Sequence, residues 1–248
     1  MDHLQLGILA SLIVGATTGF GGLPVLFMKN LNQRVLDTLL GFAAGVMLAA
    51  TAFSLLIPAI EYGGVLQATP AFIIGATAIY LIDKYVPHEH IFKGHEGPPS
   101  TRLSGTSLMI IAITIHNFPE GLAVGVSFGG EDLTAALTIA FAIALQNIPE
   151  GSAVAFPLVR AGFRRRKAAF YALLTGLLEP VGGVIGVSIV TLSTHMLPTA
   201  LSFAGGAMAF VVSHEMIPES HRFGHEKEAT FGFVAGFALM MLLDNAFA

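Results

Sequence analysis

The chain has no cysteine and no tryptophan, and it carries little charge. The lack of cysteine excludes disulfides, thiolate metal sites and cysteine nucleophiles. Without tryptophan, any aromatic belt at a membrane surface must consist of tyrosine and phenylalanine. Only 11% of the 248 residues are charged and 54% are hydrophobic, whereas soluble domains carry about 25% charged residues. These proportions predict that a lipid bilayer surrounds most of the chain, and the net charge of -4 predicts no nucleic-acid partner.

Long apolar segments fill most of the sequence. A membrane-spanning helix needs about 20 mostly apolar residues. Segments of this kind predict eight spanning helices, at 4–27, 36–59, 66–86, 103–127, 133–159, 168–191, 197–219 and 228–247. The start of the chain lacks the basic region and cleavage site of a signal peptide, so the first segment is predicted to be retained. We therefore expect an all-α integral membrane protein in which residues 1–248 form a single transmembrane domain.

The basic residues fall in alternate connections between these helices. They are Lys29, Arg34, Lys84, Lys93, Arg102, Arg160, Arg164, Arg165, Arg166, Lys167, Arg222 and Lys227. The opposite side has no basic residue and carries Asp2, Glu61, Glu131, Asp132 and Asp244. Because basic loops stay in the cytoplasm, this pattern predicts a multi-pass protein with both termini outside.

One of the basic connections, residues 87–102, is rich in histidine. It contains the run PHEHIFKGHEGPPS, with His88, His90, His95, Glu89 and Glu96. Two interpretations are open for this loop. It is either a metal-catching segment on the cytoplasmic side or a flexible polar linker.

Two copies of one polar motif interrupt the fourth and fifth spans. Residues 116–121 read HNFPEG and residues 146–151 read QNIPEG. Ionisable groups inside a membrane cost about 2.5–3.5 kcal/mol each on insertion scales, so they indicate function. In a helix, the first, second and fifth positions of each motif lie on one face. Each proline lacks an N–H and leaves a carbonyl without its helical partner, which is tolerated only against protein or water.

Together the two motifs offer one imidazole, two carboxylates and three amides. This donor set suits Zn²⁺, Fe²⁺, Mn²⁺ or Cd²⁺ better than Cu(I). A cation would offset the charge of carboxylates inside the membrane, and two bridging carboxylates would leave room for two metal ions. The duplicated motif therefore predicts a metal site between the two helices.

These motifs resemble the ZIP family of divalent-metal transporters in its bacterial form. The resemblance extends over the whole chain, through GFAAGVMLAATAFSLLIPAIE in the second span, LLEPVGGVIG in the sixth and SHEMIPES in the seventh. It implies a 3+2+3 bundle of eight helices with an inverted repeat around helices 4 and 5, an arrangement that usually serves alternating access. It also implies uptake of zinc, with iron, manganese and cadmium as further substrates, by a homodimer in the bacterial inner membrane. The metal is then the transported substrate, and no cofactor is expected.

The resemblance further implies which residues bind the metal. The first site would use Met47, His116, Glu120, Gln146 and Glu150. The second site would use Asn117, Glu120, Asn147, Glu150 and Glu179, so that Glu120 and Glu150 bridge the two ions. Many members of the family have histidine where this chain has Gln146, which predicts a weaker first site and a broader choice of metal. His214 and Glu215 are expected on the exit path to the cytoplasm, and Ser54 at the entrance.

Other functions fit the sequence less well. His214 and Glu215 match the start of an HExxH protease motif, but position 218 is proline instead of histidine. Residues 125–129 match the nucleophile-elbow pattern GxSxG, but they end a spanning helix with no strand before them. We therefore expect no enzyme. A proton-coupled carrier of an organic substrate that uses the same carboxylates is the alternative, and the sequence leaves both the driving force and channel-like transport open.

Overall fold

The structure, a computed structural model, describes residues 2–28, 31–90, 94–98 and 105–247. Side chains are not described at 88–90, 94–96, 105–110, 112–113 and 247. Three of the basic residues used above to orient the chain, Lys29, Lys93 and Arg102, lie outside the described residues.

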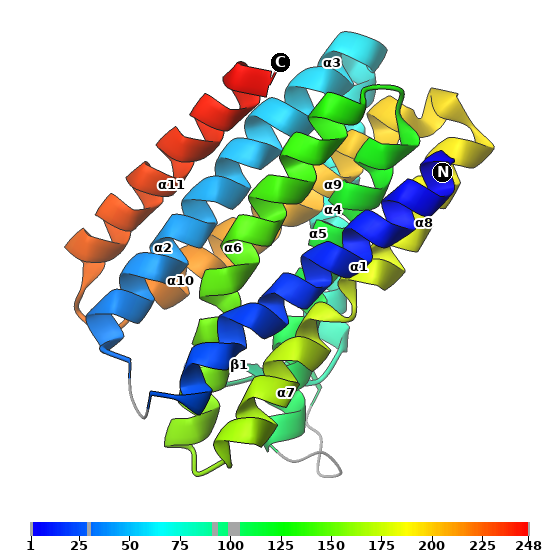
Figure 1. Cartoon of the computed structure of the whole chain (residues 1–248). Coiled ribbons are helices and arrows are strands. Elements are labelled where there is room, and N and C mark those ends of the chain that lie inside the picture. The colour runs from blue at the N-terminus through cyan, green and yellow to red at the C-terminus, as the bar shows by residue number, and fades with distance from the viewer. Residues whose placement is uncertain (1, 29–30, 91–93, 99–104, 248) are drawn as a thin grey trace.

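The chain is helical along most of this length (Figure 1). The first three spans are α1 (His3–Gly22) with η1 (Leu23–Leu26), α2 (Gln33–Ala49) with η2 (Ala50–Leu56) and α3 (Ile57–Gly63), and α4 (Val65–Tyr85). The fourth and fifth are α5 (Gly105–Gly129) and α6 (Leu133–Arg160). The sixth span consists of α7 (Arg165–Gly176) and α8 (Glu179–Leu192). The seventh consists of η3 (Thr194–Met196), α9 (Leu197–Val211), η4 (Val212–Met216) and α10 (Ile217–Ser220). The eighth is α11 (Glu226–Phe247).

These helical segments have the length and composition of membrane spans. Seven of them are long and apolar enough to cross a membrane within the described residues. The remaining helix, α5, has 25 residues and carries the first polar motif. The prediction of an all-α membrane protein with eight spans is therefore confirmed.

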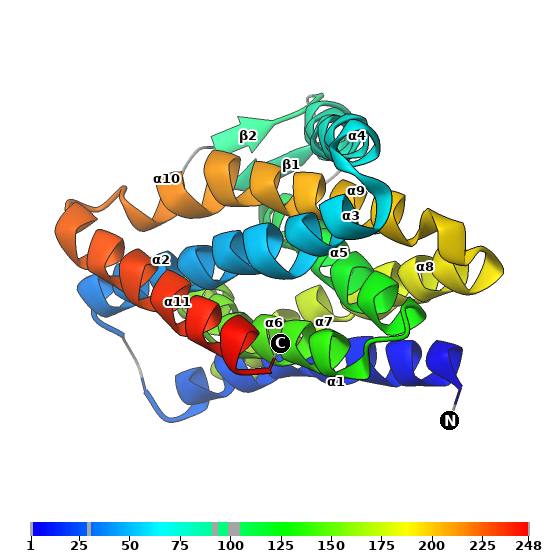
Figure 2. The same cartoon turned by 90° about the horizontal axis from the view of Figure 1, so that it is seen from above.

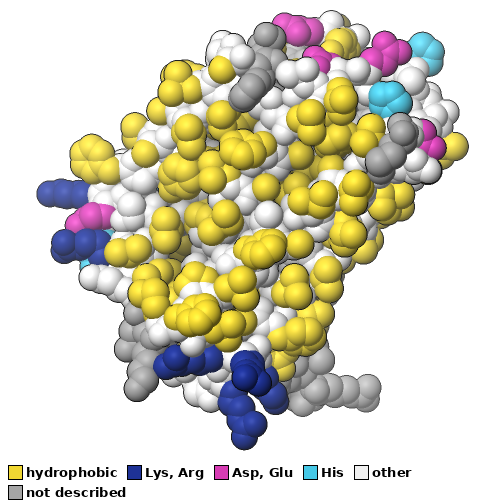
Figure 3. Space-filling view, in the orientation of Figure 1, with side chains coloured by type: hydrophobic (Ala, Val, Ile, Leu, Met, Phe, Trp, Pro, Cys, Tyr) yellow, Lys and Arg dark blue, Asp and Glu magenta, His cyan; other side chains and the backbone are white. Residues whose placement is uncertain are grey.

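Charged side chains gather at the two ends of the bundle (Figure 3). Hydrophobic side chains cover the middle of the visible face, as expected of a surface in contact with lipid. Lys and Arg side chains lie where α2, α7 and α11 begin, which we call the basic end. Acidic and histidine side chains lie near both termini, which we call the acidic end.

The histidine-rich connection forms a short antiparallel ribbon that the sequence did not predict. Strand β1 (His88–His90) pairs with β2 (Gly94–Glu96), so that the backbone of His88 lies opposite Glu96 and that of Glu89 opposite His95. Residues 91–93 and 99–104 of the predicted loop lie outside the described residues. Both interpretations of this loop, the metal-catching segment and the flexible linker, stay predictions.

The helices pair in a pattern that is unchanged when the two halves of the chain are exchanged. In Figure 2, α2 lies along α11, and α4, seen nearly end-on, lies beside α9, which pairs span 2 with span 8 and span 3 with span 7. On the other side, α1 lies along α6 and α5 along α8, which pairs span 1 with span 5 and span 4 with span 6. If span 1 is exchanged with span 6, span 2 with 7, span 3 with 8 and span 4 with 5, each of these four pairs becomes another of the four. Because spans 1 and 6 cross the bundle in opposite directions, the repeat is inverted.

Spans 2 and 7 each contain a π-helical segment at the equivalent place. The segment η2 precedes Ile57 and Pro58, and η4 precedes Ile217 and Pro218. A proline lacks the N–H for the ordinary helical bond and its ring crowds the turn before it, which favours a wider turn there. The two halves show no obvious repeat in their sequences, yet both spans carry a Gly-x-Met step, a π-helix and an Ile-Pro pair in the same order.

Glycines bring some helix pairs into backbone contact. A Cβ atom on Gly121 would overlap the carbonyl oxygen of Glu179, which shows how closely α5 and α8 approach. Gly15 and Gly176 play the same role between α1 and α7, and further glycines do so between α2 and α11 and between α4 and α9. Spans 1, 4, 5 and 6 thus form one closely packed group, and spans 2, 3, 7 and 8 are joined by close pairs in another.

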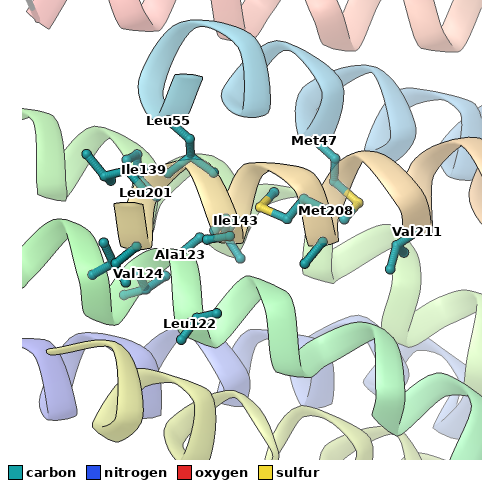
Figure 4. Close-up of a cluster of buried hydrophobic side chains, with 14 of the residues drawn as sticks. Met47, Leu55, Leu122, Ala123, Val124, Ile139, Ile143, Leu201, Met208 and Val211 are labelled. Carbon is teal, nitrogen blue, oxygen red and sulfur yellow. The ribbon is translucent and has the colours of Figure 1, made fainter. Parts of the chain in front are cut away.

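The boundary between these two groups is filled by side chains instead. We call this boundary the seam, and it contains Met47, Leu55, Leu122, Val124, Ile139, Ile143, Leu201 and Met208 (Figure 4). These side chains come from α2, η2, α5, α6 and α9. Among the glycines in the described part of the chain, none brings α5 or α6 into backbone contact with α2 or α9. The seam is therefore an apolar contact between two groups that are each more tightly joined within themselves.

Candidate metal site

Six of the predicted ligands come together from three helices, α5, α6 and α8. The amide and carboxyl side chains of the two motifs in α5 and α6 are buried, with exposed fractions of 1% for Asn117 and Glu120 and zero for Gln146 and Asn147, whereas His116 is half-buried. Both helices continue through their motif prolines as α-helix. The third helix is α8, which begins at Glu179 after the sixth span breaks behind Gly176. The first turn of a helix favours a carboxylate, because its free N–H groups and its dipole are positive there.

One carboxylate oxygen of Glu179 accepts hydrogen bonds from the side chains of both motif asparagines. Asn117 donates from Nδ2 to Oε1 of Glu179 over 3.1 Å, and Asn147 donates from Nδ2 to the same atom over 2.7 Å. Asn147 also donates to the carbonyl oxygen of Val14, over 3.1 Å. The structure thus brings together three of the residues predicted for the second site.

A second contact joins the two motifs to each other. Gln146 donates from Nε2 to Oε1 of Glu120 over 3.0 Å. The carboxyl groups of Glu150 and Glu179 lie close enough to Glu120 to interact with it electrostatically. Three carboxyl groups therefore share one buried region, an arrangement that repels itself unless a cation or protons are present.

The oxygens without a hydrogen-bond partner lie almost entirely on these residues. Among the buried side chains that the structure describes, seven oxygen or nitrogen atoms have no such partner, and all seven are oxygens. Six of them are Asn117 Oδ1, Glu120 Oε2, Gln146 Oε1, Asn147 Oδ1, Glu150 Oε1 and Glu179 Oε2. The seventh is Oγ1 of Thr51 in η2. Buried polar atoms normally find partners, so six unpaired oxygens on six predicted ligands indicate a site for a cation.

The structure places His116 beside an exit residue. Its Nε2 contacts Oε2 of Glu215 in η4, which links the predicted first site to the predicted exit path. The neighbouring His214 lies 3.6 Å from Oδ2 of Asp83 in α4 and stacks on the ring of Phe210. Within the described residues no three His, Asp or Glu side chains form a ready metal cage, since amides supply part of the donor set and His116 contacts Glu215.

Met47 and Ser54 lie outside this cluster of oxygens. Met47 is fully buried and packs in the seam. Ser54 donates from Oγ to Oδ1 of Asp244 over 2.5 Å. Ser54 and Asp244 line a pocket of about 330 Å³ at the acidic end, together with Glu61, Glu131, Asp132 and Thr138. Ile139 and Leu201 of the seam also line this pocket, so apolar side chains separate it from the metal site.

Three residues of these contacts were not predicted from the sequence to belong to the metal site or to its entrance or exit. Thr18 donates from Oγ1 to Oε1 of Glu179 over 3.3 Å, Asp83 lies beside His214, and Asp244 accepts from Ser54. Asp83 and Asp244 are carboxylates inside predicted spans, which was an available signal. Thr18 gave no such signal, because threonine is common in spanning helices, where it usually bonds to its own helix.

Comparison with known proteins agrees with this geometry. The model of the family described as ZIP zinc transporter matches residues 88–244, which include both motifs and Glu179. The zinc transporter GufA of Myxococcus xanthus is 44% identical over 96% of this chain and 97% of its own length. The chain belongs to the ZIP family. Another ZIP protein, the zinc transporter ZIPB of Bordetella bronchiseptica, is 42% identical over 98% of this chain and 82% of its own.

More distant ZIP proteins match over the same extent. The zinc transporter ZIP11 of Homo sapiens is 34% identical over 96% of both chains. The zinc transporter ZupT of Akkermansia muciniphila is 35% identical over 98% of this chain and 97% of its own. The bacterial-type ZIP resemblance inferred from the motifs is thereby confirmed over nearly the whole sequence.

Proposed function

We propose that this chain transports divalent transition-metal cations, zinc first among them, through a site at the middle of the membrane into the cytoplasm. The observation that carries the proposal is the set of six unpaired buried oxygens on six predicted ligands. The names of the relatives, all zinc transporters, support zinc as the substrate. They lend no support to the alternative of an organic substrate. Iron, manganese and cadmium are further candidates, because carboxylates, amides and one imidazole also suit them.

The proposed site holds two ions. The first would be bound by Met47, His116, Glu120, Gln146 and Glu150, and the second by Asn117, Glu120, Asn147, Glu150 and Glu179. The amide nitrogens of Gln146 and the two asparagines already hold carboxylate oxygens. Their own oxygens are therefore left for the metal. For His116 to bind the first ion, it would have to release Glu215, which offers a way to pass the ion on.

The path through the protein follows from the two ends of the bundle. The acidic pocket lined by Ser54 and Asp244 would attract cations and serve as the entrance. His214 and Glu215 would serve the exit. The basic end then faces the cytoplasm of a bacterial cell, both termini lie outside, and the protein sits in the inner membrane. We expect a homodimer, as the family resemblance implies.

Alternating access is the mechanism that this packing favours. The oxygens of the site belong to spans 4, 5 and 6, which form a closely packed group with span 1. The seam that separates this group from spans 2, 3, 7 and 8 consists of flexible side chains such as Met47, Leu55 and Met208. A shear along such a boundary changes fewer close contacts than one within a glycine-joined pair. The site could thus pass from one side of the membrane to the other with its group of helices.

Zinc uptake into liposomes tests the proposal. We expect the purified protein to carry zinc into vesicles that enclose a zinc-sensitive dye. The Glu120→Gln/Glu150→Gln double variant should abolish this uptake, since it removes both bridging carboxylates with little change in shape. The matched control is Glu226→Gln, which removes an exposed carboxylate at the start of α11. Normal uptake by the double variant would overturn the proposed site, and zinc-independent thermal stability of the wild type would favour an organic carrier.

A further inference from the structure

Thr18 of α1 is held in a fixed position beside the proposed second metal ion. Its side chain is fully buried. A Cβ atom on Gly176 would lie 2.9 Å from both Cβ and Oγ1 of Thr18, so α7 closes on this side chain directly. On the α6 side, a Cβ atom on Gly151 would overlap the carbonyl oxygen of Thr18. Two glycines thus let two helices reach this one residue.

The hydroxyl of Thr18 donates its hydrogen bond to a different helix instead of to its own. A buried threonine in a spanning helix usually donates to a carbonyl one turn earlier in its own helix. The buried Thr175 does so with the carbonyl of Ala172, over 2.8 Å, and the buried Thr138 does so with that of Thr134, over 2.9 Å. Thr18 Oγ1 instead donates to Oε1 of Glu179, over 3.3 Å. This distance is longer than most O–H···O bonds, and a shift of a few tenths of an ångström in Glu179 would bring it to the common length.

The bond from Thr18 completes the set of donors around one carboxylate oxygen. Oε1 of Glu179 accepts hydrogen bonds from Thr18 of α1, Asn117 of α5 and Asn147 of α6. With three donors this oxygen has no room for a further ligand. Oε2 has no partner within the described residues. Glu179 can therefore offer a metal ion one oxygen only.

We propose that Thr18 is a positioning residue for the second metal site, which fixes Glu179 as a ligand through Oε2 alone. The inference rests on the proposed metal site and adds the first span to it. A hydrogen-bond partner of a metal ligand fixes the orientation of that ligand, and its loss typically lowers metal affinity about 10- to 100-fold. The role belongs to the hydroxyl, since the methyl group of threonine cannot donate.

Two substitutions separate the hydroxyl from the shape of the side chain. Thr18→Val keeps the branched shape and removes the donor, and Thr18→Ser keeps the donor and removes a methyl group. In calorimetric titrations of the full chain with zinc, we expect Thr18→Val to weaken the second binding event about tenfold. Thr18→Ser should stay within about twofold of the wild type, because the hydroxyl is retained. A purely structural role would give the reverse order, since serine leaves the larger packing defect.

Glu179→Gln shows whether Thr18 acts through Glu179. If it does, Thr18→Val should weaken zinc binding no further in a chain that already carries Glu179→Gln. Additive effects of the two substitutions, or wild-type zinc binding by Thr18→Val, would overturn the inference for Thr18 and leave the metal site standing. Wild-type zinc binding by Glu179→Gln itself would overturn the second site and the inference together.

Discussion

Gln146 of α6 donates from Nε2 to Oε1 of Glu120 of α5, over 3.0 Å. The two copies of the motif are thus joined by the very residue in which they differ, since the other copy carries His116 at this position. Gln146 acts as a donor to a carboxylate with its nitrogen and leaves its oxygen unpaired. An imidazole at the same place could offer a nitrogen to the metal but would hold Glu120 differently.

Replacing Gln146 by histidine should strengthen the first site and narrow its choice of metal. Imidazole nitrogen is a better ligand for zinc than amide oxygen, whereas manganese gains less from it. We expect zinc affinity to rise about tenfold, which is about 1.4 kcal/mol. Competition titrations of zinc against manganese would measure the change. Gln67→His, which adds an exposed imidazole near Thr199, should leave the ratio of affinities unchanged.

Removing the metal should destabilise the protein. A ligand at 100 times its dissociation constant stabilises the folded state by about 2.7 kcal/mol. Thermal unfolding in detergent should therefore show a lower Tm after chelation of zinc. The Glu120→Gln/Glu150→Gln variant provides the control, since chelation should not change its Tm. An equal shift in both proteins would place the stabilising zinc elsewhere.

Gly121→Ala should damage both stability and transport. Its added methyl group would overlap the carbonyl oxygen of Glu179 and push α8 away from α5. Overpacking of this kind costs about 1–3 kcal/mol, and the displaced Glu179 should weaken zinc binding. At Gly130, in contrast, an added Cβ would lie 3.4 Å from its nearest neighbours. Gly130→Ala should unfold and bind zinc like the wild type in the same assays.

Asp244→Asn should impair capture of the metal more than its binding at the middle of the membrane. The substitution removes one charge from the acidic pocket and keeps an oxygen for Ser54. We expect the KM for zinc uptake to rise several-fold at low ionic strength, with the maximal rate nearly unchanged, because steering by charge acts on encounter. Asp2→Asn, at the N-cap of α1 and outside the pocket lining, is the matched control. A lower maximal rate with unchanged KM would contradict an entrance role.

Much of this architecture could be predicted from the sequence because the bilayer imposes strong rules. Apolar runs of span length and polar groups inside them directly indicated the helices and a site between Glu120 and Glu150, and the family resemblance added Glu179. The partners of those groups could not be predicted in the same way. The contact of His116 with Glu215 joins residues 99 positions apart, and that of Ser54 with Asp244 joins residues 190 apart. Such contacts depend on how whole helices pack.

The hidden repeat was missed for a different reason. The distance from glycine to proline is 13 residues in span 2, from Gly45 to Pro58, and 12 in span 7, from Gly206 to Pro218. A one-residue difference defeats a direct comparison of the two stretches. A π-helix absorbs residues without changing either flank, so the two spans keep equivalent ends despite unequal lengths.

The inverted pairing of the helices also bears on how one sequence can store two conformations. If each half of the chain took up the arrangement of the other, every helix pair would find its counterpart, and the pocket at the acidic end would reappear at the basic end. The two arrangements would then differ in free energy only through positions at which the halves are unlike. His116 opposite Gln146, and His214–Glu215 opposite Ser54–Leu55 when the two Ile-Pro pairs are aligned, are such positions. The relative populations of the outward-facing and inward-facing states would thus be set by the residues at which the two halves differ.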